Sequence, residues 1–397
     1  MARARGTYNF TIIREFLNLK YPFMWILDCK KARVILALLA FVLHGAQSAA
    51  TDAPPSLSRP LVVRWSYETR QIASQTPATF ADVLYVPLVG GVVTAVRPQD
   101  GQLLWRSEAG GEFSAAPAAD ERGVYVSSEL SAEGVDASAM YTKGVVRALS
   151  RTSGVALWTR TVPNPFEGAL VLDDGLILGA STDGRIYALD KGTGVPAWIV
   201  KTEHSFRSDP VMADGRLYLA SEDGYLLVVA SKTGMIIRRY RTGNPQAAPF
   251  TVSGRVLYTG SADGYVTALR EAGARLETVW RKRAGTSVQT LISTPDGLLV
   301  ASRDNFVYFL SHRNGSRLWK KQMPGRVLGA PLVSSDGALF TILGGDVSVA
   351  LSLADGKQVN TLSLGEGNAA STRPLTAGPF VIIPTRDGLL AFAHSNQ

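Results

Sequence analysis

The chain has 397 residues, and its 41 Lys or Arg against 33 Asp or Glu give a formal net charge of +8. Positions 1–50 hold seven of the basic and two of the acidic residues, so the remainder has 34 basic and 31 acidic residues. The only basic runs left are short pairs such as Arg238-Arg239 and Lys320-Lys321, which argues against nucleic-acid binding. The single cysteine, Cys29, also lies in 1–50, which excludes a disulfide or haem-attachment motif in the rest.

Positions 1–50 have the features of a secretory signal. Three basic residues within 30–33 precede the apolar run 34–43, and small residues follow at 48–50. This order predicts cleavage after Ala50 and a periplasmic or secreted mature protein. Ten apolar residues are too few to span a bilayer, so we expect no transmembrane span in the mature chain; a retained anchor is the alternative. We expect the true start to be Met24, because 1–23 is long for such a segment.

From about residue 61, one phrase recurs with a period close to forty residues. Its clearest copy runs from Asp183 to Trp198. The copies end at Trp65, Trp105, Trp158, Trp198, Arg238, Trp280, Trp319 and Val359. Their spacings are 39–42 residues except for one of 53, which places an insertion of about 13 residues around Ser131–Tyr141. A fixed period in this range predicts a repeat architecture.

Each copy is followed by two apolar runs separated by a polar turn. The runs are rich in Val, Leu, Ile and Tyr and are bounded by Asp-Gly, Ser-Gly or Thr-Gly, which indicates antiparallel strands joined by tight turns. Four strands per forty residues make one propeller blade. The sequence therefore predicts an all-β, eight-bladed β-propeller of four-stranded antiparallel blades, with a solenoid or two half-rings as alternatives.

The two ends of the repeat region complement each other. The first unit is only a terminal strand, 61–65, and the last, 371–393, has only the other three strands. We therefore expect the last blade to be closed by the N- and C-terminal strands, leaving no open sheet edge. The predicted organisation is an extension and signal peptide at 1–50, a linker at 51–60 and the propeller at 61–397.

The recurring tryptophans are predicted to dock one blade onto the next. An indole can approach a neighbouring blade closely where its partners are small. Ala precedes it in the adjacent strand (Ala95, Ala148, Ala188, Ala268, Ala350), and Gly lies in the turn before it (Gly154, Gly194, Gly315). We assign the structural docking role to Trp65, Trp105, Trp158, Trp198, Trp280 and Trp319.

At these residues the chain resembles the pyrroloquinoline-quinone-type β-propeller repeat family. The family phrase Ala-Leu-Asp-x-x-Thr-Gly-x-x-x-Trp is matched at Ala188–Trp198, and the resemblance covers about 61–393. The family includes quinone-dependent dehydrogenases and non-catalytic scaffolds. In size and blade count the chain is most similar to the non-catalytic branch that contains the periplasmic propeller subunit of the outer-membrane β-barrel assembly machinery. Cys29 precedes the apolar run, unlike the lipid-attachment cysteine usual for that subunit.

The resemblance implies a monomeric, non-catalytic periplasmic scaffold that binds a protein partner in the cell envelope, such as a component of that machinery, and could associate with the membrane through it. It implies two alternatives: a dehydrogenase with pyrroloquinoline quinone and calcium in the central channel, or an envelope sensor that binds a ligand. Enzymes of the family are usually longer and carry adjacent paired cysteines, which this chain lacks.

Candidate binding residues gather on one face of the predicted propeller. The loop between a blade's second and third strands, and the linker to the next blade, emerge on the same face, and loops on a rigid scaffold often carry function. Residues leading into the innermost strands line the predicted channel mouth: Glu167, Arg207, Asp209, Gln246, Gln289, Arg326 and Arg373. The aromatic candidates in the loops are Phe113, Tyr141, Phe166 and Phe206. The arginines could hold an anionic ligand or a partner's carboxylate, or pair with the acidic residues beside them.

Catalytic and metal-binding motifs do not appear in the sequence. The histidines are scattered without metal-ligand spacing, and we expect each at the surface or in a turn. The Asp-Gly pairs at 183, 223 and 263 recur in register at strand turns, which favours turn chemistry over a calcium loop. We therefore expect no catalytic residue, metal or cofactor.

Overall fold

The computed structural model describes residues 54–395 apart from 70, 131–142, 243–249 and 274. These residues belong to one compact unit, Asp52–Gln397. They form 32 strands and no helix, which confirms the predicted all-β class for the described part of the chain.

The strands follow one another as short meanders. In chain order they are β1 (Leu61–Glu68); β2 (Ala78–Phe80), β3 (Val83–Leu88), β4 (Val92–Val96), β5 (Leu103–Glu108); β6 (Glu112–Ala119), β7 (Val124–Leu130), β8 (Lys143–Leu149), β9 (Ala156–Val162); β10 (Phe166–Asp173), β11 (Leu176–Ser181), β12 (Arg185–Asp190), β13 (Pro196–Lys201). They continue with β14 (Val211–Ala213), β15 (Arg216–Ala220), β16 (Tyr225–Ala230), β17 (Ile236–Arg241); β18 (Phe250–Ser253), β19 (Val256–Gly260), β20 (Tyr265–Ala272), β21 (Arg275–Arg283). The last are β22 (Val288–Ser293), β23 (Leu298–Ser302), β24 (Phe306–Leu310), β25 (Arg317–Gln322); β26 (Leu332–Val333), β27 (Gly337–Thr341), β28 (Val347–Ser352), β29 (Gln358–Ser363); β30 (Leu375–Ala377), β31 (Phe380–Pro384), β32 (Gly388–His394).

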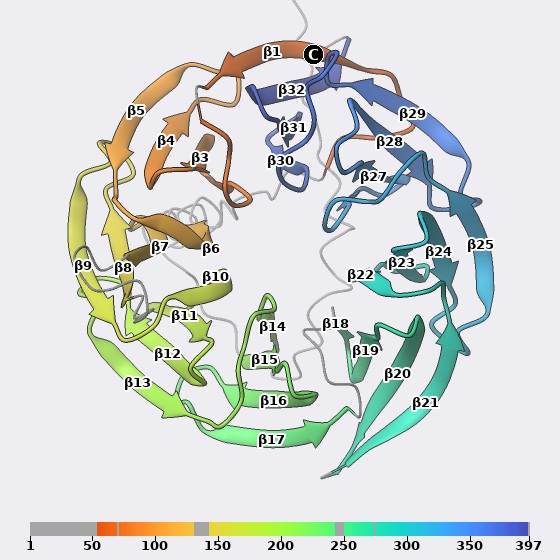
Figure 1. Cartoon of the computed structure of the whole chain (residues 1–397), viewed down its shortest axis with the longest axis horizontal. Helices are drawn as coiled ribbons and strands as arrows, with labels where there is room; N and C mark the ends of the chain where they lie inside the picture. The colour runs from red at the N-terminus through yellow and green to blue at the C-terminus, as the bar shows by residue number, and fades with distance from the viewer. Residues whose placement is uncertain (1–53, 70, 131–142, 243–249, 274, 396–397) are drawn as a thin grey trace, which may run out of the picture. The chain divides into compact units, whose positions relative to one another are not determined.

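The described strands pair into six sheets of four strands and one of eight. The eight-stranded sheet consists of two meanders, β6–β9 and β10–β13, joined by a short parallel pairing of Gly168 with Ala115 and Ala169 with Ala116. The described residues thus form eight four-stranded meanders, set around a common axis as a β-propeller (Figure 1). In the closing sheet, of order β1-β32-β31-β30, the N-terminal strand completes the C-terminal meander, as predicted.

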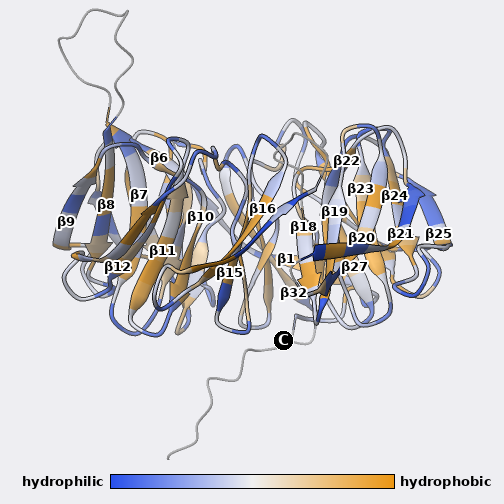
Figure 2. Ribbon diagram, turned by 90° about the horizontal axis from the view of Figure 1, so that it is seen from below, coloured by the Kyte–Doolittle hydropathy of each residue, from blue (hydrophilic) through white to orange (hydrophobic). Residues whose placement is uncertain are grey.

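The connectivity gives the ring two different faces. The linkers between meanders, such as 202–210 and 364–374, emerge beside the turns between second and third strands; we call this the linker face. The remaining turns emerge on the opposite side, the turn face. Hydrophobic residues concentrate within the strands, and hydrophilic ones at the turns of both faces (Figure 2).

Successive meanders are joined by a repeated side-chain hydrogen bond. One residue of each outer strand donates an N–H to a backbone carbonyl on the turn face of the next meander. In the described residues the pairs are Trp65 to Pro98, Trp105 to Arg151, Trp158 to Lys191, Trp198 to Ser231, Arg238 to Gly273, Trp280 to His312, Trp319 to Leu353 and Asn360 to Arg59, at 2.7–3.2 Å. Where the repeat lacks Trp, Arg or Asn supplies the donor. The bond from Asn360 closes the ring.

Two details of this docking differ from the sequence prediction. The residue in register with the tryptophans is Asn360, not Val359, because Asn360 pairs with Ala350 just before a strand irregularity. The glycines also meet a different ring: a Cβ built on Gly154 would lie 2.5 Å from Trp105 of the preceding meander, not near Trp158. Each glycine therefore accepts the indole of the blade before it.

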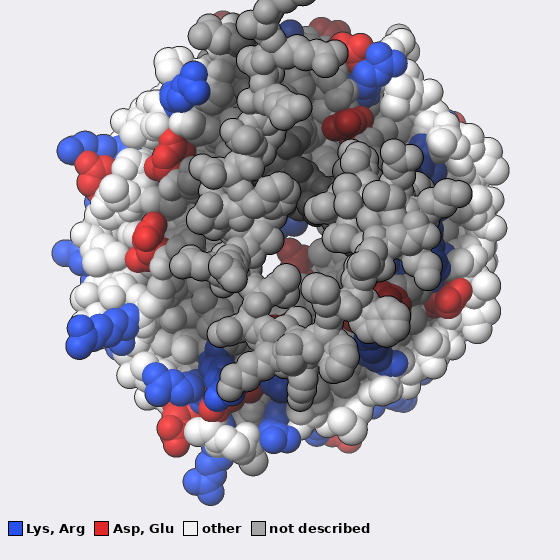
Figure 3. Space-filling model, turned by 180° about the vertical axis from the view of Figure 1, so that it is seen from behind, with Lys and Arg blue, Asp and Glu red and all other residues white. Residues whose placement is uncertain are grey.

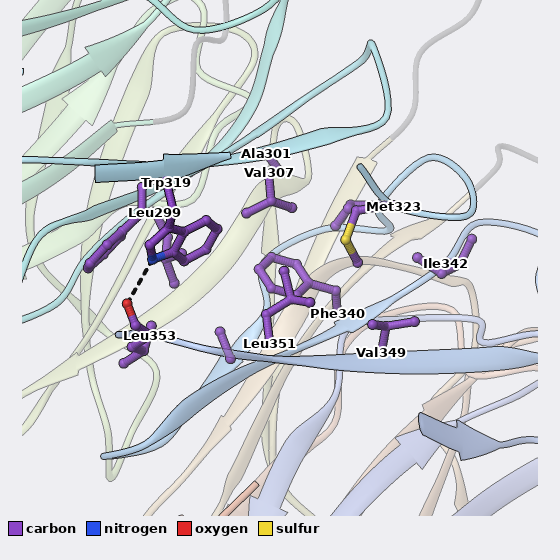
Figure 4. Packing of buried hydrophobic residues seen from close by; sticks show 13 residues of the cluster. Leu299, Ala301, Val307, Trp319, Met323, Phe340, Ile342, Val349, Leu351 and Leu353 are labelled. Carbon is purple, nitrogen blue, oxygen red and sulfur yellow. Dashed lines mark hydrogen bonds between the residues drawn. The ribbon is translucent and has the colours of Figure 1, made fainter. Parts of the chain in front are cut away.

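Trp319 shows how this contact joins two blades (Figure 4). Its ring packs in a buried cluster that includes Val307 of its own meander and Phe340 and Leu351 of the next. Its Nε1 donates to Leu353 O at 2.8 Å, and its ring is stacked on Phe309 with centroids 5.2 Å apart. The contact therefore combines burial of an aromatic side chain with satisfaction of its polar atom.

The segment before β1 is also held by its neighbour. Leu57 is fully buried within a cluster that includes Leu339 and Leu362. Asp336 accepts hydrogen bonds from the hydroxyls of Ser56 and Ser58 and from the Leu57 N–H. Burial acts to raise the pKa of Asp336, but these bonds and one from Ser334 outweigh it and hold that pKa well below its usual range. Part of the predicted linker 51–60 is thus packed against the ring.

We expect Trp319→Ala to lower the free energy of unfolding by about 3–5 kcal/mol, because a buried aromatic side chain is lost. Gly356→Ala should also destabilise the protein, since a Cβ there would lie 2.6 Å from the Trp319 ring. The control is Gly344→Ala, which has nearly the same positive φ (69° against 70°) but open space around the new Cβ. Denaturant unfolding that gave the same loss for both glycine variants would contradict the docking assignment.

Asp336→Asn should make the free energy of unfolding less dependent on pH in the acidic range. A carboxylate whose pKa is lowered by folding stabilises the protein above its unfolded pKa, about 4, and loses that contribution as the pH falls through the folded pKa. Denaturant unfolding should therefore show a smaller drop between neutral and acidic pH in the variant than in the wild type. The double variant Ser56→Ala/Ser58→Ala should reduce this drop similarly, and an unchanged drop in both variants would refute the proposed role of Asp336.

Candidate functional site

A cavity of about 700 Å³ lies at the centre of the ring. Its walls come from the starts of the innermost strands and the linkers that lead into them, from residues 74–76 round to 372–373. The inner strands and their linkers thus converge on one space that is lined by both polar and apolar residues. This is the cavity of the described residues that fits the predicted channel.

Four of the seven predicted channel residues line this cavity: Arg207, Asp209, Gln289 and Arg373. Glu167 is not part of the lining, but its Oε1 lies 4.0 Å from Arg207 Nη1. Arg326 is exposed on the linker face and is not part of the lining, although Leu328 and Gly329 of the same linker are. Gln246, like Tyr141 and the insertion around Ser131–Tyr141, lies outside the described residues.

Arg207 is already occupied by acidic side chains. Its Nε lies 2.8 Å from Glu222 Oε1, a shorter contact than that with Glu167. Burial raises the pKa of Glu167, and the nearby Glu129 and Glu222 act in the same direction, while Arg207 lowers it. Arg207 therefore serves to keep a group of carboxylates together, which favours mutual pairing over ligand binding at this residue.

Asp209 and Arg373 are the charged lining groups that have no ion-pair partner within 4.0 Å among the residues described. Asp209 is exposed and Arg373 is half-buried. A carboxylate and a guanidinium left open in this way can each accept a ligand or partner group of opposite charge. These two residues are the chemically available part of the cavity.

Glutamines tie the cavity wall together. Gln289 Nε2 donates to Val327 O at 2.8 Å, and Gln75 Nε2 donates to Phe113 O at 3.2 Å. The first bond joins the inner strand β22 to the linker of the next meander, and the second joins the linker before β2 to the inner strand β6. Gln75 was missed by the sequence reasoning; its signal was a glutamine near the start of an inner strand, three residues before β2, whereas Gln289 is the second residue of β22.

The aromatic candidates Phe113, Phe166 and Phe206 are packing residues, contrary to the sequence prediction. They are 5%, 0% and 1% exposed, so they cannot contact a partner at the surface. Phe113 and Phe166 lie at the start of an inner strand and pair with Ser128 and Ser181 of the second strand. Phe206 lies in the linker before β14 and forms an isolated bridge with Ser221, just after β15. Because side chains alternate along a strand, the ring points into the blade and the next residue, such as Glu167 or Arg207, points the other way.

The Asp-Gly positions behave as turns. Asp183, Asp223 and Asp263 each accept a hydrogen bond from the serine two residues earlier. His204 is buried rather than at the surface, and its Nδ1 lies 2.7 Å from Asp223 Oδ2. His394 is buried as well. No group of three or more His, Cys, Asp or Glu with metal-binding geometry occurs in the part of the chain that is described.

The described lining of the cavity does not fit pyrroloquinoline quinone with its calcium ion. Calcium takes six to eight oxygen ligands, usually including several carboxylates, whereas Asp209 is the one carboxylate among the described lining residues. The one aromatic ring there, Phe250, is largely buried, so it offers little surface to a flat quinone. We therefore derive no redox step.

The chain matches one protein-family profile along most of its length. The family profile described as "Outer membrane protein assembly factor BamB" matches residues 57–139, 142–275 and 239–397. No curated protein sequence gives a significant match. Among residues with a described structure, no helix is long and apolar enough to cross a membrane.

Solved structures share the fold at low sequence identity. BamB from Moraxella catarrhalis is 16% identical, with a TM-score of 0.68 over 85% of this chain and 99% of that one. The computationally designed protein Ika8 is also 16% identical, with a TM-score of 0.68 over 83% and 98%. Quinohemoprotein alcohol dehydrogenase from Comamonas testosteroni is 12% identical, with a TM-score of 0.63 over 88% and 82%.

These structures show the fold alone, and the family assignment rests on the profile, whose three matches together span nearly all of the propeller. The chain belongs to the outer membrane protein assembly factor BamB family.

Proposed function

We propose that this protein is a non-catalytic scaffold of the cell envelope that binds a protein partner through its linker face. Membership of a family described as an outer-membrane protein assembly factor supports a partner from that process. The predicted signal peptide at 1–50 supports a periplasmic location. A fold shared with an alcohol dehydrogenase does not by itself indicate catalysis, because one fold hosts unrelated functions.

The linker face is the more variable side of the ring. Its linkers range from the short 109–111 to the long 364–374. Long connections on a rigid scaffold can be reshaped without disturbing the blades. The turn face, in contrast, holds the eight carbonyl acceptors of the docking bonds described above, so its turns are constrained by the need to close the ring. Partner recognition is therefore better accommodated on the linker face.

One arc of this face combines free cations with exposed apolar side chains. Across the three successive meanders from β26 to β5, the exposed residues of these two kinds are Arg326, Arg386, Leu343, Ile72 and Val89, which we call the linker-face arc. The same loops also expose Asp346, Glu366 and Asp387. Leu343, Val89 and Ile72 are 53%, 45% and 42% exposed. Neither arginine forms an ion pair among the described residues. Arginine is enriched at protein interfaces, and the buried core of an interface is more apolar than its rim.

The proposal rests on a contrast between Arg207 and Arg326. Arg207 is held by Glu222 and Glu167 within the ring, whereas Arg326 is exposed and unpaired beside Leu343, whose N–H bonds to Arg326 O. An interface arginine must be free to reach a partner's carboxylate. We therefore move the expected contact from the channel mouth towards the linker-face arc.

A photo-crosslinking amino acid at Leu343 or Ile72 should form an adduct in cells with one envelope protein, a component of outer-membrane protein assembly. The control positions are Met235 and Val195 on the turn face, which are exposed at 63% and 51% and should give no such adduct. Adducts of equal yield from both faces would overturn the choice of face.

Arg326→Glu should reduce the adduct formed from Leu343, because the charge offered to the partner is reversed. The matched control is Arg313→Glu, an exposed cation in a turn of the opposite face. Loss of the adduct in both variants would show a general charge effect instead. If changes within 131–141 abolish the adduct while Arg326→Glu does not, the contact lies in the insertion.

The dehydrogenase alternative has a direct test. Purified protein mixed with pyrroloquinoline quinone and calcium should not reduce an electron-acceptor dye in the presence of alcohols or sugars, since Asp209 is the one carboxylate of the described cavity lining. A quinone-dependent rate that disappears on adding a calcium chelator would replace the scaffold proposal with the enzyme.

A further inference from the structure

The positive charge of the described ring is concentrated on three outer strands. β17, β21 and β25 together contain ten basic residues and one acidic residue, Glu277. The other described residues comprise 23 basic and 27 acidic ones. The ring is thus positive by nine charges on these three strands and negative by four elsewhere. The sequence analysis named two of these groups, Arg238-Arg239 and Lys320-Lys321, as short isolated pairs.

The fold brings these cations into line. Arg238, Trp280 and Trp319 are the docking residues of the three strands, and the cations fill the positions just after them: Arg239, Arg241, Arg281, Lys282, Arg283, Lys320 and Lys321. We call these seven residues the basic rim. The strands β17, β21 and β25 follow one another around the outer edge (Figure 1). Blue side chains accordingly gather along the left and lower-left edge in Figure 3, which views the ring from behind.

The basic rim has little counter-charge of its own. Six of its residues are exposed and Lys321 is half-buried. Among the described residues it forms one ion pair, between Arg281 Nη2 and Asp263 Oδ2 at 3.5 Å. The other six have no neutralising partner among the described residues, so the like charges repel one another and raise the local potential, which an external polyanion would relieve. The rim therefore points to an anionic partner.

The aromatic rings beside the rim argue against a nucleic acid. Proteins that bind single strands stack bases on open aromatic faces. Here the Arg281 guanidinium lies 4.0 Å from the centre of the Tyr265 ring, and Lys320 Nζ lies 3.7 Å from that of Phe306. These cations cover the faces that a base would need. What remains on the outer edge is charge alone, which suits a surface of anionic headgroups that requires no stacking and no shaped groove.

We propose that the basic rim binds the surface of a membrane rich in anionic lipid, so that the ring is held at the bilayer by its edge. The choice of a membrane surface rests on the proposed envelope function, while the charge asymmetry itself does not. Each Lys or Arg near an anionic bilayer strengthens binding roughly fivefold. Removing three should therefore weaken it by roughly 100-fold at low ionic strength.

The test measures co-sedimentation of the purified protein with phosphatidylglycerol–phosphatidylcholine vesicles and with pure phosphatidylcholine vesicles. The difference between the two isolates the charge effect from any contribution of apolar segments. The rim variant is Arg239→Gln/Lys282→Gln/Lys321→Gln, which spares the cations that cover Tyr265 and Phe306 and the docking residue Arg238. The control variant, Arg106→Gln/Arg160→Gln/Lys201→Gln, removes equal charge from outer strands β5, β9 and β13.

The rim variant should lose binding to the anionic vesicles, while the control variant should retain most of it. Equal loss in both variants, no preference of the wild type for anionic vesicles, or tighter binding to a single-stranded oligonucleotide than to vesicles would overturn the proposal. If the rim variant fails to fold, the salt dependence of the wild type serves instead. Binding of the wild type to anionic vesicles that persists at high salt would also overturn the proposal. The crosslink from Leu343 in the rim variant separates the two proposals, because it reports on the partner and not on the lipid.

Discussion

The whole ring depends on one contact repeated between neighbouring blades: a side-chain N–H from an outer strand that bonds to a backbone carbonyl of the next turn. A propeller blade cannot bury both of its faces alone, so its stability comes from the blades beside it. The indole suits this task because its large apolar ring and its single donor are used together. Arg238 and Asn360 have no indole ring, but each still donates an N–H to the next blade. The hydrogen bond is thus the more persistent half of the contact, and burial of the indole is added where space allows.

This contact gives the two faces of the ring different roles. The carbonyls that accept it, such as Lys191 O and Leu353 O, lie in turns that must keep their geometry. Some of these turns carry further links: Lys191 Nζ also forms a buried ion pair with Asp120 of the preceding meander, at 2.8 Å. Burial acts to raise the pKa of Asp120, but Lys191 and other hydrogen-bond donors outweigh it and lower that pKa. The turn face is therefore committed to holding the ring together, whereas linkers of very different lengths are compatible with the same ring on the other side.

The period of the sequence was enough to predict the class, the meanders and the shared final blade, because strand lengths and turn residues are local properties. It could not tell which glycine each indole meets, since a perfect repeat looks the same whether a contact is made within a unit or with the next. The burial of Phe206 also escaped it. Residues at a linker–strand boundary point into the blade or towards the channel according to the backbone pairing, here the bridge from Phe206 to Ser221. Leu57 and Gln75 were missed because their partners lie in other meanders.

The same docking geometry explains why the charges of the outer edge act together. The hydrogen bond from Arg238, Trp280 or Trp319 fixes the register of its strand against the neighbouring blade. A strand shifted by one residue would lose this hydrogen bond. The positions that follow are therefore held at equal heights around the ring, so that cations placed there in three separate repeats form one continuous rim. On β17 the docking residue is itself a cation. A constraint that evolved to close the ring thus also aligns the outer surface, and a few basic substitutions in successive repeats are sufficient to build an extended charged edge without altering the fold.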